Sequence, residues 1–300
     1  MPGYTIDGVP HDVLKNRFGA TTHDQLQRLE APLVAARYTQ IEAGLGPNGN
    51  FDAEHLRAIH RHLFQDVYEW AGHSRDEVVT LSDGTFATEP FMHKGDTTFM
   101  AGPAIPSALD EVGRSLREAE YLRGLPREEF AQRAAAIMVQ INGIHAFREG
   151  NGRTQRVFME QLARQAGHAL EFSVVSQERM IEASIAANER GDPSVMRRLF
   201  DEISNPSRVE VLRAAEEQLD RQKYNWNERY IATVEPGYPV ELTMVGIARD
   251  QFMAHTGSRI LLGKTSDLPE PRPRRGEAFT FVAPQYCWQT ETDRDKTGVQ

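Results

Sequence analysis

The spacing of apolar residues along this chain predicts a protein built mainly from helices. After Asp52, a residue type that often caps a helix N-terminus, apolar side chains recur every three or four positions. These are Leu56, Ile59, Leu63 and Val67. The same spacing of apolar residues predicts further helices over 12–18, 24–42, 107–122, 128–141, 153–165, 177–189, 193–203 and 208–226.

Two regions depart from this helical pattern and predict strands. In 76–90, β-branched residues flank Ser82-Asp83-Gly84, which is typical of a hairpin turn. After Thr233, short runs of β-branched and aromatic residues alternate with turn residues, and this pattern is typical of a small β domain. Its expected strands lie near 240–245, 259–262 and 278–282.

These patterns suggest four regions along the chain. Ser204-Asn205-Pro206-Ser207 favours a boundary between the helical part and the C-terminal third of the chain. We expect an N-terminal helical extension over 1–50, a catalytic core over 51–205, a connecting helix with a small OB-like β domain over 206–285, and a disordered tail over 286–300.

Composition then narrows the class of protein. The 300 residues are 40% hydrophobic and 26% charged, which is ordinary for a globular chain with a core. The net charge of −9 argues against a nucleic-acid partner, and the single cysteine, Cys287, excludes an intrachain disulfide. The first residues lack a secretory signal, and no apolar run is long enough to span a membrane. We expect a protein made in the cytoplasm.

Residues 145–156, HAFREGNGRTQR, gather the residue types that a phosphoryl-transfer site needs. Gly150, Asn151 and Gly152 precede a predicted helix, so their backbone N–H groups can converge on an anion at its N-terminus. Arg153 and Arg156 are three residues apart, share a helix face and carry forked donors for phosphate oxygens.

The remaining two polar groups suit the chemistry of transfer. Glu149 would repel phosphates unless a Mg²⁺ ion lay between them, so it is a candidate metal ligand. His145 has an ordinary pKa near 6.5, which suits a general base. Taken singly, each residue fits an ordinary turn or helix surface; together they favour a site.

This run resembles the signature of the Fic family, His-Pro-Phe-x-[Asp/Glu]-Gly-Asn-Gly-Arg-x-x-Arg. The resemblance implies a mainly α Fic-type helical bundle, with the hairpin as a flap, that transfers AMP from ATP to a Ser, Thr or Tyr hydroxyl of a target protein. It assigns His145 as general base, Glu149 to Mg²⁺, Gly150 to Arg153 to the phosphate cradle, and Arg156 to the γ-phosphate. Kinase-like members carry Lys where this chain has Gly152.

The resemblance also implies how a target is held and how activity is controlled. The flap residues Val79, Thr80, Leu81, Thr85 and Phe86 would hold the target by strand addition. No [Ser/Thr]-x-x-x-Glu-[Gly/Asn] inhibitory motif is present in the sequence, so we expect a separate small antitoxin to pair with Arg156. The chain is similar to type IV-secreted Bartonella effectors and conjugation-linked Fic toxins, which implies secretion into another cell and a longer natural protein.

One position departs from the signature, and it keeps two alternatives open. Ala146 stands where the family usually has Pro, which leaves the His145 loop freer and predicts lower efficiency. The alternatives are a catalytically weak Fic-fold binding module and a Fic enzyme that uses another nucleotide.

Overall fold

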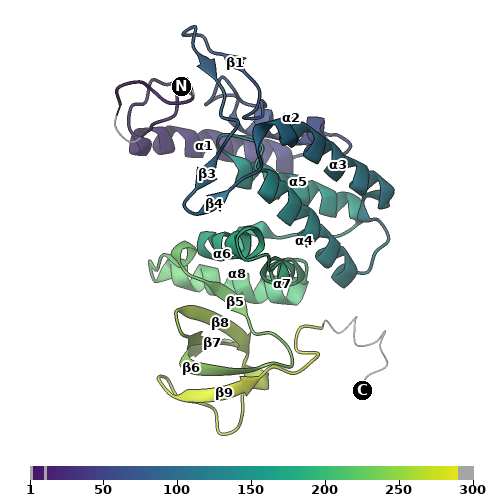
Figure 1. Cartoon of the computed structure of the whole chain (residues 1–300). Coiled ribbons are helices and arrows are strands. Elements are labelled where there is room, and N and C mark those ends of the chain that lie inside the picture. The colour runs from purple at the N-terminus through teal and green to yellow at the C-terminus, as the bar shows by residue number, and fades with distance from the viewer. Residues whose placement is uncertain (1–2, 10–11, 290–300) are drawn as a thin grey trace. The chain divides into compact units, whose positions relative to one another are not determined.

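The computed structural model describes residues 3–9 and 12–289, which form two compact units. The first unit comprises the described residues of Met1–Leu125 together with Arg133–His168. The second comprises Pro126–Gln132 and the described residues from Ala169 onward. The two units together hold eight α-helices in the described part of the chain (Figure 1).

The first unit is built around helix α2. Its α-helices are α1 (His23–Glu42), α2 (Ala53–Phe64), α3 (Ile105–Glu118), most of α4 (Arg127–Ile144) and α5 (Asn151–Ala166). Asp52 caps α2 by accepting a hydrogen bond from the His55 N–H at 2.9 Å, and Leu56, Ile59 and Leu63 are buried. The predicted apolar face is confirmed, and α2 packs against α1, α3 and α5.

Two hairpins protrude from the helices of this unit (Figure 1). Strand β1 (Val79–Thr80) pairs antiparallel with β2 (Phe86–Ala87), which confirms the predicted hairpin. Strand β3 (His93–Lys94) pairs antiparallel with β4 (Thr97–Thr98). This second hairpin was not predicted, because strands of two residues are too short to show apolar alternation.

The predicted helix over 12–18 is wrong. Thr5 forms an antiparallel bridge with Leu14, and the Lys15 N–H donates to the Tyr4 carbonyl at 2.8 Å. Val13 and Leu14 are buried in this arrangement. The apolar residues that suggested a helix therefore belong to an extended arm that folds back on itself.

The second unit begins with three helices and ends with a mixed sheet. Helices α6 (Gln177–Asn188), α7 (Ser194–Ile203) and α8 (Pro206–Arg221) match the predicted ranges closely, although α8 ends five residues early. Ser176 caps α6 and Asn205 caps α8, each by accepting from a backbone N–H three residues later. The domain boundaries expected from the sequence stay a prediction.

The sheet has the strand order β5-β8-β7-β6-β9, with β5 and β8 parallel and the other pairs antiparallel. Its strands are β5 (Ile231–Thr233), β6 (Pro239–Ala248), β7 (Gln251–Thr256), β8 (Arg259–Lys264) and β9 (Ala278–Val282). Three of these strands were predicted, and Leu242 and Met244 of β6 point into the core with the expected alternation. Strands β5 and β7 were missed.

A buried charge cluster joins the helices of the second unit to its sheet. Glu202 is 0% exposed, pairs with Arg179, and accepts hydrogen bonds from the backbone N–H and hydroxyl of Thr233 at 2.5 Å. Arg208 donates to the Thr233 hydroxyl at 2.6 Å and pairs with Asp201 at 2.9 Å. The cluster therefore fixes α6, α7 and α8 to β5.

The described residues end at 289, inside the predicted tail. Cys287 and Trp288 are buried, and the Trp288 ring N–H donates to the Val234 carbonyl at 3.0 Å. Residues 290–300 of the predicted tail lie outside the described residues. Across residues 3–9 and 12–289, no helix combines the length and apolar character needed to cross a bilayer.

Candidate active site

The loop between α4 and α5 carries the predicted motif, and Gly150 shapes its end. Gly150 caps α5 with a φ of 84°, in the left-handed region that glycine adopts without strain. A Cβ atom at this position would overlap the ring of Phe64 on α2. Position 150 therefore requires glycine for two reasons: its backbone angle and the close approach of Phe64 on α2.

Asn151 locks the loop rather than facing outward. Its side chain is 4% exposed; its Oδ1 accepts from the Phe147 N–H at 2.9 Å, and its Nδ2 donates to the Phe147 carbonyl at 2.6 Å. The first N–H groups of α5, including those of Gly152 and Arg153, have no intrahelical acceptor. Such free donors at a helix N-terminus are suited to an anion, and a Cβ at Gly152 would meet only open space.

His145 lies at the start of the loop, in an enclosed position. It is 8% exposed, has a φ of 48°, and stacks on Phe99 with ring centroids 3.8 Å apart and planes inclined by 15°. Burial, then the positive charges of Lys94 and Arg75, lower the pKa of His145 to about 3, while the Asn142 carbonyl works in the opposite direction. The ring is therefore neutral at physiological pH.

Glu149 and Arg153 form an ion pair at the N-terminal end of α5. The Glu149 Oε1 accepts from the Gly150 N–H at 2.9 Å and lies 3.4 Å from the Arg153 guanidinium. Arg153 also pairs with Glu30 of α1, and its guanidinium lies over the Phe64 ring, 4.6 Å from the centroid. Glu149 keeps one carboxylate oxygen that makes no hydrogen bond to the described residues.

Arg156 lies one helical turn beyond Arg153 and is half-buried. Burial lowers its pKa from the usual value, and the carboxylate of Glu160 acts in the opposite direction. Glu160 accepts a hydrogen bond from the Tyr38 hydroxyl at 2.7 Å. Within the part of the chain that the structure describes, no carboxylate lies within 4 Å of the Arg156 guanidinium.

His60 supports the motif loop and was not identified from the sequence as part of the site. It is 0% exposed, and its Nδ1 accepts from the Gly72 N–H at 2.8 Å. The proton must therefore be on Nε2, which donates to the Glu149 carbonyl at 3.0 Å. The His60 ring also stacks on Phe147 at 3.9 Å. No sequence signal indicates this role, because His60 is 89 residues from Glu149.

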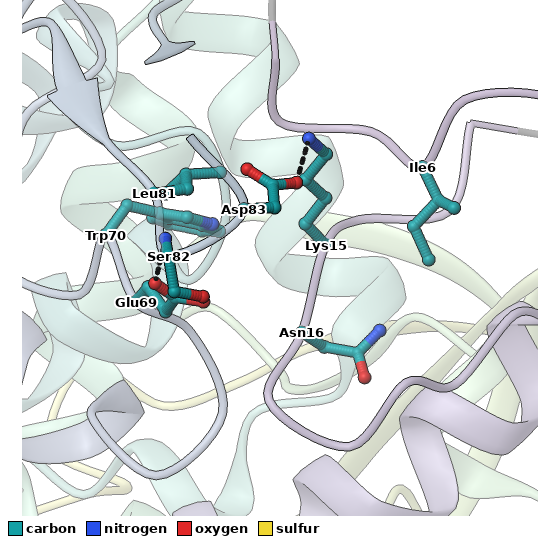
Figure 2. A pocket seen from close by; sticks show the side chains of 8 residues that line it. All are labelled: Ile6, Lys15, Asn16, Glu69, Trp70, Leu81, Ser82 and Asp83. Carbon is teal, nitrogen blue, oxygen red and sulfur yellow. Dashed lines mark hydrogen bonds and ion pairs between the residues drawn. The ribbon is translucent and has the colours of Figure 1, made fainter. Parts of the chain in front are cut away.

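The N-terminal arm holds the turn of the β1–β2 hairpin (Figure 2). Lys15 pairs with Asp83 at 2.7 Å, and Glu69 accepts from the Ser82 hydroxyl at 2.7 Å. A pocket of about 240 Å³ lies between arm and turn. At the other end of the arm, a Cβ atom at Gly3 would overlap the Phe86 carbonyl.

The five predicted flap residues differ in what they can offer. Leu81 is buried, and the Thr85 hydroxyl is bonded within the turn to Asp83 at 2.6 Å and to Lys15. Val79 is half-buried, whereas Thr80 is exposed and Phe86 is 59% exposed. Thr80 and Phe86 therefore present the accessible side chains of this hairpin.

Comparison with known proteins decides the family. Residues 50–163 match the profile of the Fic/DOC family. A "Probable protein adenylyltransferase Fic" from Salmonella typhimurium is 34% identical over 66% of this chain and 90% of its own length. The chain belongs to the Fic/DOC family. The Fic match covers the whole motif, all of α4, and α5 as far as residue 163.

Other Fic relatives extend the likeness. A "Protein adenylyltransferase" from Bartonella henselae is 36% identical over 78% of this chain, which spans 44% of that relative's length. The solved structure of a "Type IV secretion system effector protein BepA" is 32% identical, covers 94% of this chain and 96% of that one, and has a TM-score of 0.86. The BepC protein from Bartonella tribocorum, solved with bound AMPPNP, is 36% identical over 67% of this chain and 95% of its own, with a TM-score of 0.64.

Proposed function

We propose that the chain transfers AMP from ATP to a hydroxyl group of a target protein. The observation that carries this proposal is the position of His145, a neutral buried base, in the loop that leads directly into the anion site of α5. The relatives named protein adenylyltransferases and the AMPPNP-bound BepC structure support ATP as the nucleotide.

The residues present fit a nucleotide triphosphate and a magnesium ion. Gly152 leaves open space in front of the first N–H groups of α5, as a phosphate at this end of the helix would require. Glu149 offers one free carboxylate oxygen, which suits Mg²⁺, an ion that takes one or two carboxylates and fills its other positions with phosphate and water. When bound, the ion would neutralise charge on the phosphates.

The reaction that these residues support is an in-line displacement. A ring nitrogen of His145 accepts the proton of the target hydroxyl as its oxygen forms a bond to the α-phosphorus. The bond from that phosphorus to the bridging oxygen breaks, and pyrophosphate leaves. Arg153 and the N–H groups of α5 hold the phosphates, and Arg156 meets the γ-phosphate. Negative charge on the phosphates would raise the pKa of His145 toward the range of a useful base.

Labelled AMP provides the test. With α-³²P-ATP, Mg²⁺ and a cell lysate, the wild type should label a protein, and His145→Ala should lose about 10²–10⁴-fold of this activity. His255→Ala, which changes an exposed histidine of β7, should label normally. Absence of label from the wild type would contradict the proposal, and label from a different nucleotide would favour that nucleotide instead.

We also propose that the β1–β2 hairpin is a flap that holds the target by strand addition. Exposed Thr80 lies on β1, and exposed Phe86 lies opposite it on β2. Main-chain bonds to such an edge position an extended segment with little demand on its sequence. Thr80→Pro should raise the KM for a protein target, and ATP binding measured by calorimetry should stay unchanged; an unchanged KM would contradict the flap.

We also propose that a separate small antitoxin regulates the chain through Arg156. This cation has no carboxylate within ion-pair distance among the described residues, so a glutamate of a partner can pair with it. A small protein encoded beside this chain should reduce AMP transfer by the wild type. Full activity in its presence would count against the antitoxin.

Two broader proposals concern location and the second unit. The BepA relative is named a type IV secretion system effector, which supports delivery of this chain into another cell. A translocation assay with a reporter fusion tests this.

We propose further that the five-stranded sheet is an OB-like module that docks proteins. Its parallel β5–β8 pair beside an antiparallel meander supports that likeness.

A further inference from the structure

Arg75 is a buried arginine that holds together the surroundings of His145. It follows α2 in the first unit and is 0% exposed. Its Nε donates to the His145 carbonyl at 2.9 Å. Its two Nη atoms donate to four more carbonyls: those of Glu89 at 3.2 Å, Pro90 at 2.8 Å, Ile144 at 3.4 Å, and Met100.

Arg75 receives little compensation from negative charge. In the described residues, no carboxylate lies within 4 Å of its guanidinium, and burial lowers its pKa from the usual value despite the fields of Glu89 and Asp76. Burying a cation in this way is costly unless hydrogen bonds satisfy it. Only the arginine fork offers five donors in fixed directions, so the carbonyls that it binds explain why an arginine is needed here.

The five carbonyls belong to three separate segments of the first unit. Ile144 and His145 end α4 and begin the motif loop, Glu89 and Pro90 follow flap strand β2, and Met100 follows strand β4. The main chain of Arg75 adds two more links: its N–H donates to the Ala146 carbonyl at 2.8 Å, and its carbonyl accepts from the Glu89 N–H at 2.7 Å.

The third segment also reaches the ring of the base. Phe99, directly before Met100, stacks on His145, and the Met100 N–H donates to the Gly143 carbonyl at 3.2 Å. Arg75 therefore fixes both the backbone of His145 and the segment that covers its ring. None of the carbonyls that its side chain binds belongs to α5.

We infer that Arg75 is a positioning residue that sets His145 relative to the flap, so that a target held on the hairpin meets the base. This inference rests on the proposed AMP transfer. The charged groups close to the His145 ring are Arg75 and Lys94 of β3. A change at Arg75 can therefore act through geometry, through charge, or through both, and two variants separate these effects.

The test compares Arg75→Lys and Arg75→Met with a matched control, Arg208→Lys, which alters a buried arginine of the second unit. Arg75→Lys keeps the charge but loses the fork, so kcat for AMP transfer should fall by about 10²-fold, with little change in the KM for ATP. The acid limb of its pH–rate profile should stay in place. Arg75→Met should lower kcat similarly and move the acid limb to higher pH, because a cation beside His145 is gone.

Hydrogen exchange provides a readout that does not depend on activity. Amides of 89–90, 99–100 and 144–146 should exchange faster in both Arg75 variants, whereas amides of α5 should change little. Arg208→Lys should leave these rates and kcat as in the wild type. A role in stability alone would lower the folded fraction, so kcat calculated per folded molecule would stay at the wild-type value and the acid limb would not move.

The outcomes distinguish this inference from the proposed function. Arg75→Lys with wild-type kcat and wild-type exchange would overturn the inference and leave AMP transfer standing. A wild type that transfers no AMP would remove the proposed function, while faster exchange in the variants would still support the positioning of His145. Failure of both variants to fold would assign Arg75 to the fold alone and overturn the inference.

Discussion

At the scale of single residues, the site depends on histidines that burial keeps neutral well below the pH at which water would protonate them. His60 and His145 are both buried, and burial lowers the pKa of each to about 3. Both rings are neutral at physiological pH, so His60 can keep donating to the Glu149 carbonyl and His145 can accept a proton.

These two histidines predict how stability depends on pH. In the unfolded chain their pKa returns to about 6.5, so between about 6.5 and 3 the unfolded state binds more protons. The free energy of unfolding should therefore be fully present above about pH 6.5 and should fall as pH falls toward 3. Urea unfolding followed by circular dichroism at pH 7.5 and 5 measures this. His145→Ala should show a smaller difference between the two pH values, and an equal difference would contradict the assignment.

The two motif glycines should respond differently to alanine. Gly150→Ala forces a left-handed backbone, at about 1–2 kcal/mol, and a clash with Phe64, at about 1–3 kcal/mol, so the melting temperature should fall. Gly152→Ala meets no atom within 4 Å and should keep wild-type stability. Because its methyl group enters the proposed phosphate space, it should weaken ATP binding. Thermal melting measures the loss of stability, and calorimetry measures the loss of ATP affinity. Wild-type ATP affinity in Gly152→Ala would argue against a phosphate bound in front of Gly152.

At the scale of elements, α1 contributes to the site although it lies outside the region that matches the family profile. Its Glu30 is 8% exposed, pairs with Arg153 and accepts a hydrogen bond from the Tyr68 hydroxyl. The carboxylate both orients Arg153 and places negative charge beside the proposed phosphates. The N-terminal extension is therefore part of the proposed nucleotide site.

Two substitutions in α1 separate orientation from charge. Glu30→Gln keeps a hydrogen-bond acceptor for Arg153 and removes the charge, so the Kd for ATP should fall severalfold, on the order of 1 kcal/mol. Glu30→Ala removes both and should bind ATP more weakly than Glu30→Gln. Asp24→Asn, on an exposed turn of the same helix, is the control. Equal affinities for the two Glu30 variants would show that orientation contributes nothing.

Sequence reasoning predicted the local structure of the motif correctly. The motif residues from His145 to Arg156 lie within twelve consecutive positions, so their order alone predicted a loop leading into a helix. His60, Arg75 and Glu30 act across 70 to 123 residues of sequence and show no local pattern. Predictions over short segments fail for another reason. The spacing of Val13 and Leu14 resembles one face of a helix, although both residues belong to an extended arm.

At the scale of the whole molecule, two compact units each carry their own buried polar cluster. Arg75 organises carbonyls in the first unit, and Glu202 with Arg179 and Arg208 organises the second. Each cluster is internal to its unit. We therefore expect damage to one cluster to appear first in the stability of its own unit.

Glu202→Gln tests this separation. It leaves Arg179 and Arg208 buried without their shared carboxylate, so the second unit should lose about 3–5 kcal/mol of stability. ATP binding by the first unit should stay unchanged where that unit remains folded. Urea titration with hydrogen exchange resolved by segment measures both, and a parallel loss of protection in α5 would contradict independence.

The packing of the N-terminal arm against the β1–β2 hairpin determines where the protein can be labelled for experiments. Because Gly3 has no room for a side chain beside the Phe86 carbonyl, and Lys15 holds the turn, a bulky group attached to this arm would disturb the surface proposed to meet a target. The exposed loop over 44–50 borders the far end of α5, next to Arg164. A fluorophore or affinity handle placed there would report on the protein without touching the β1–β2 hairpin.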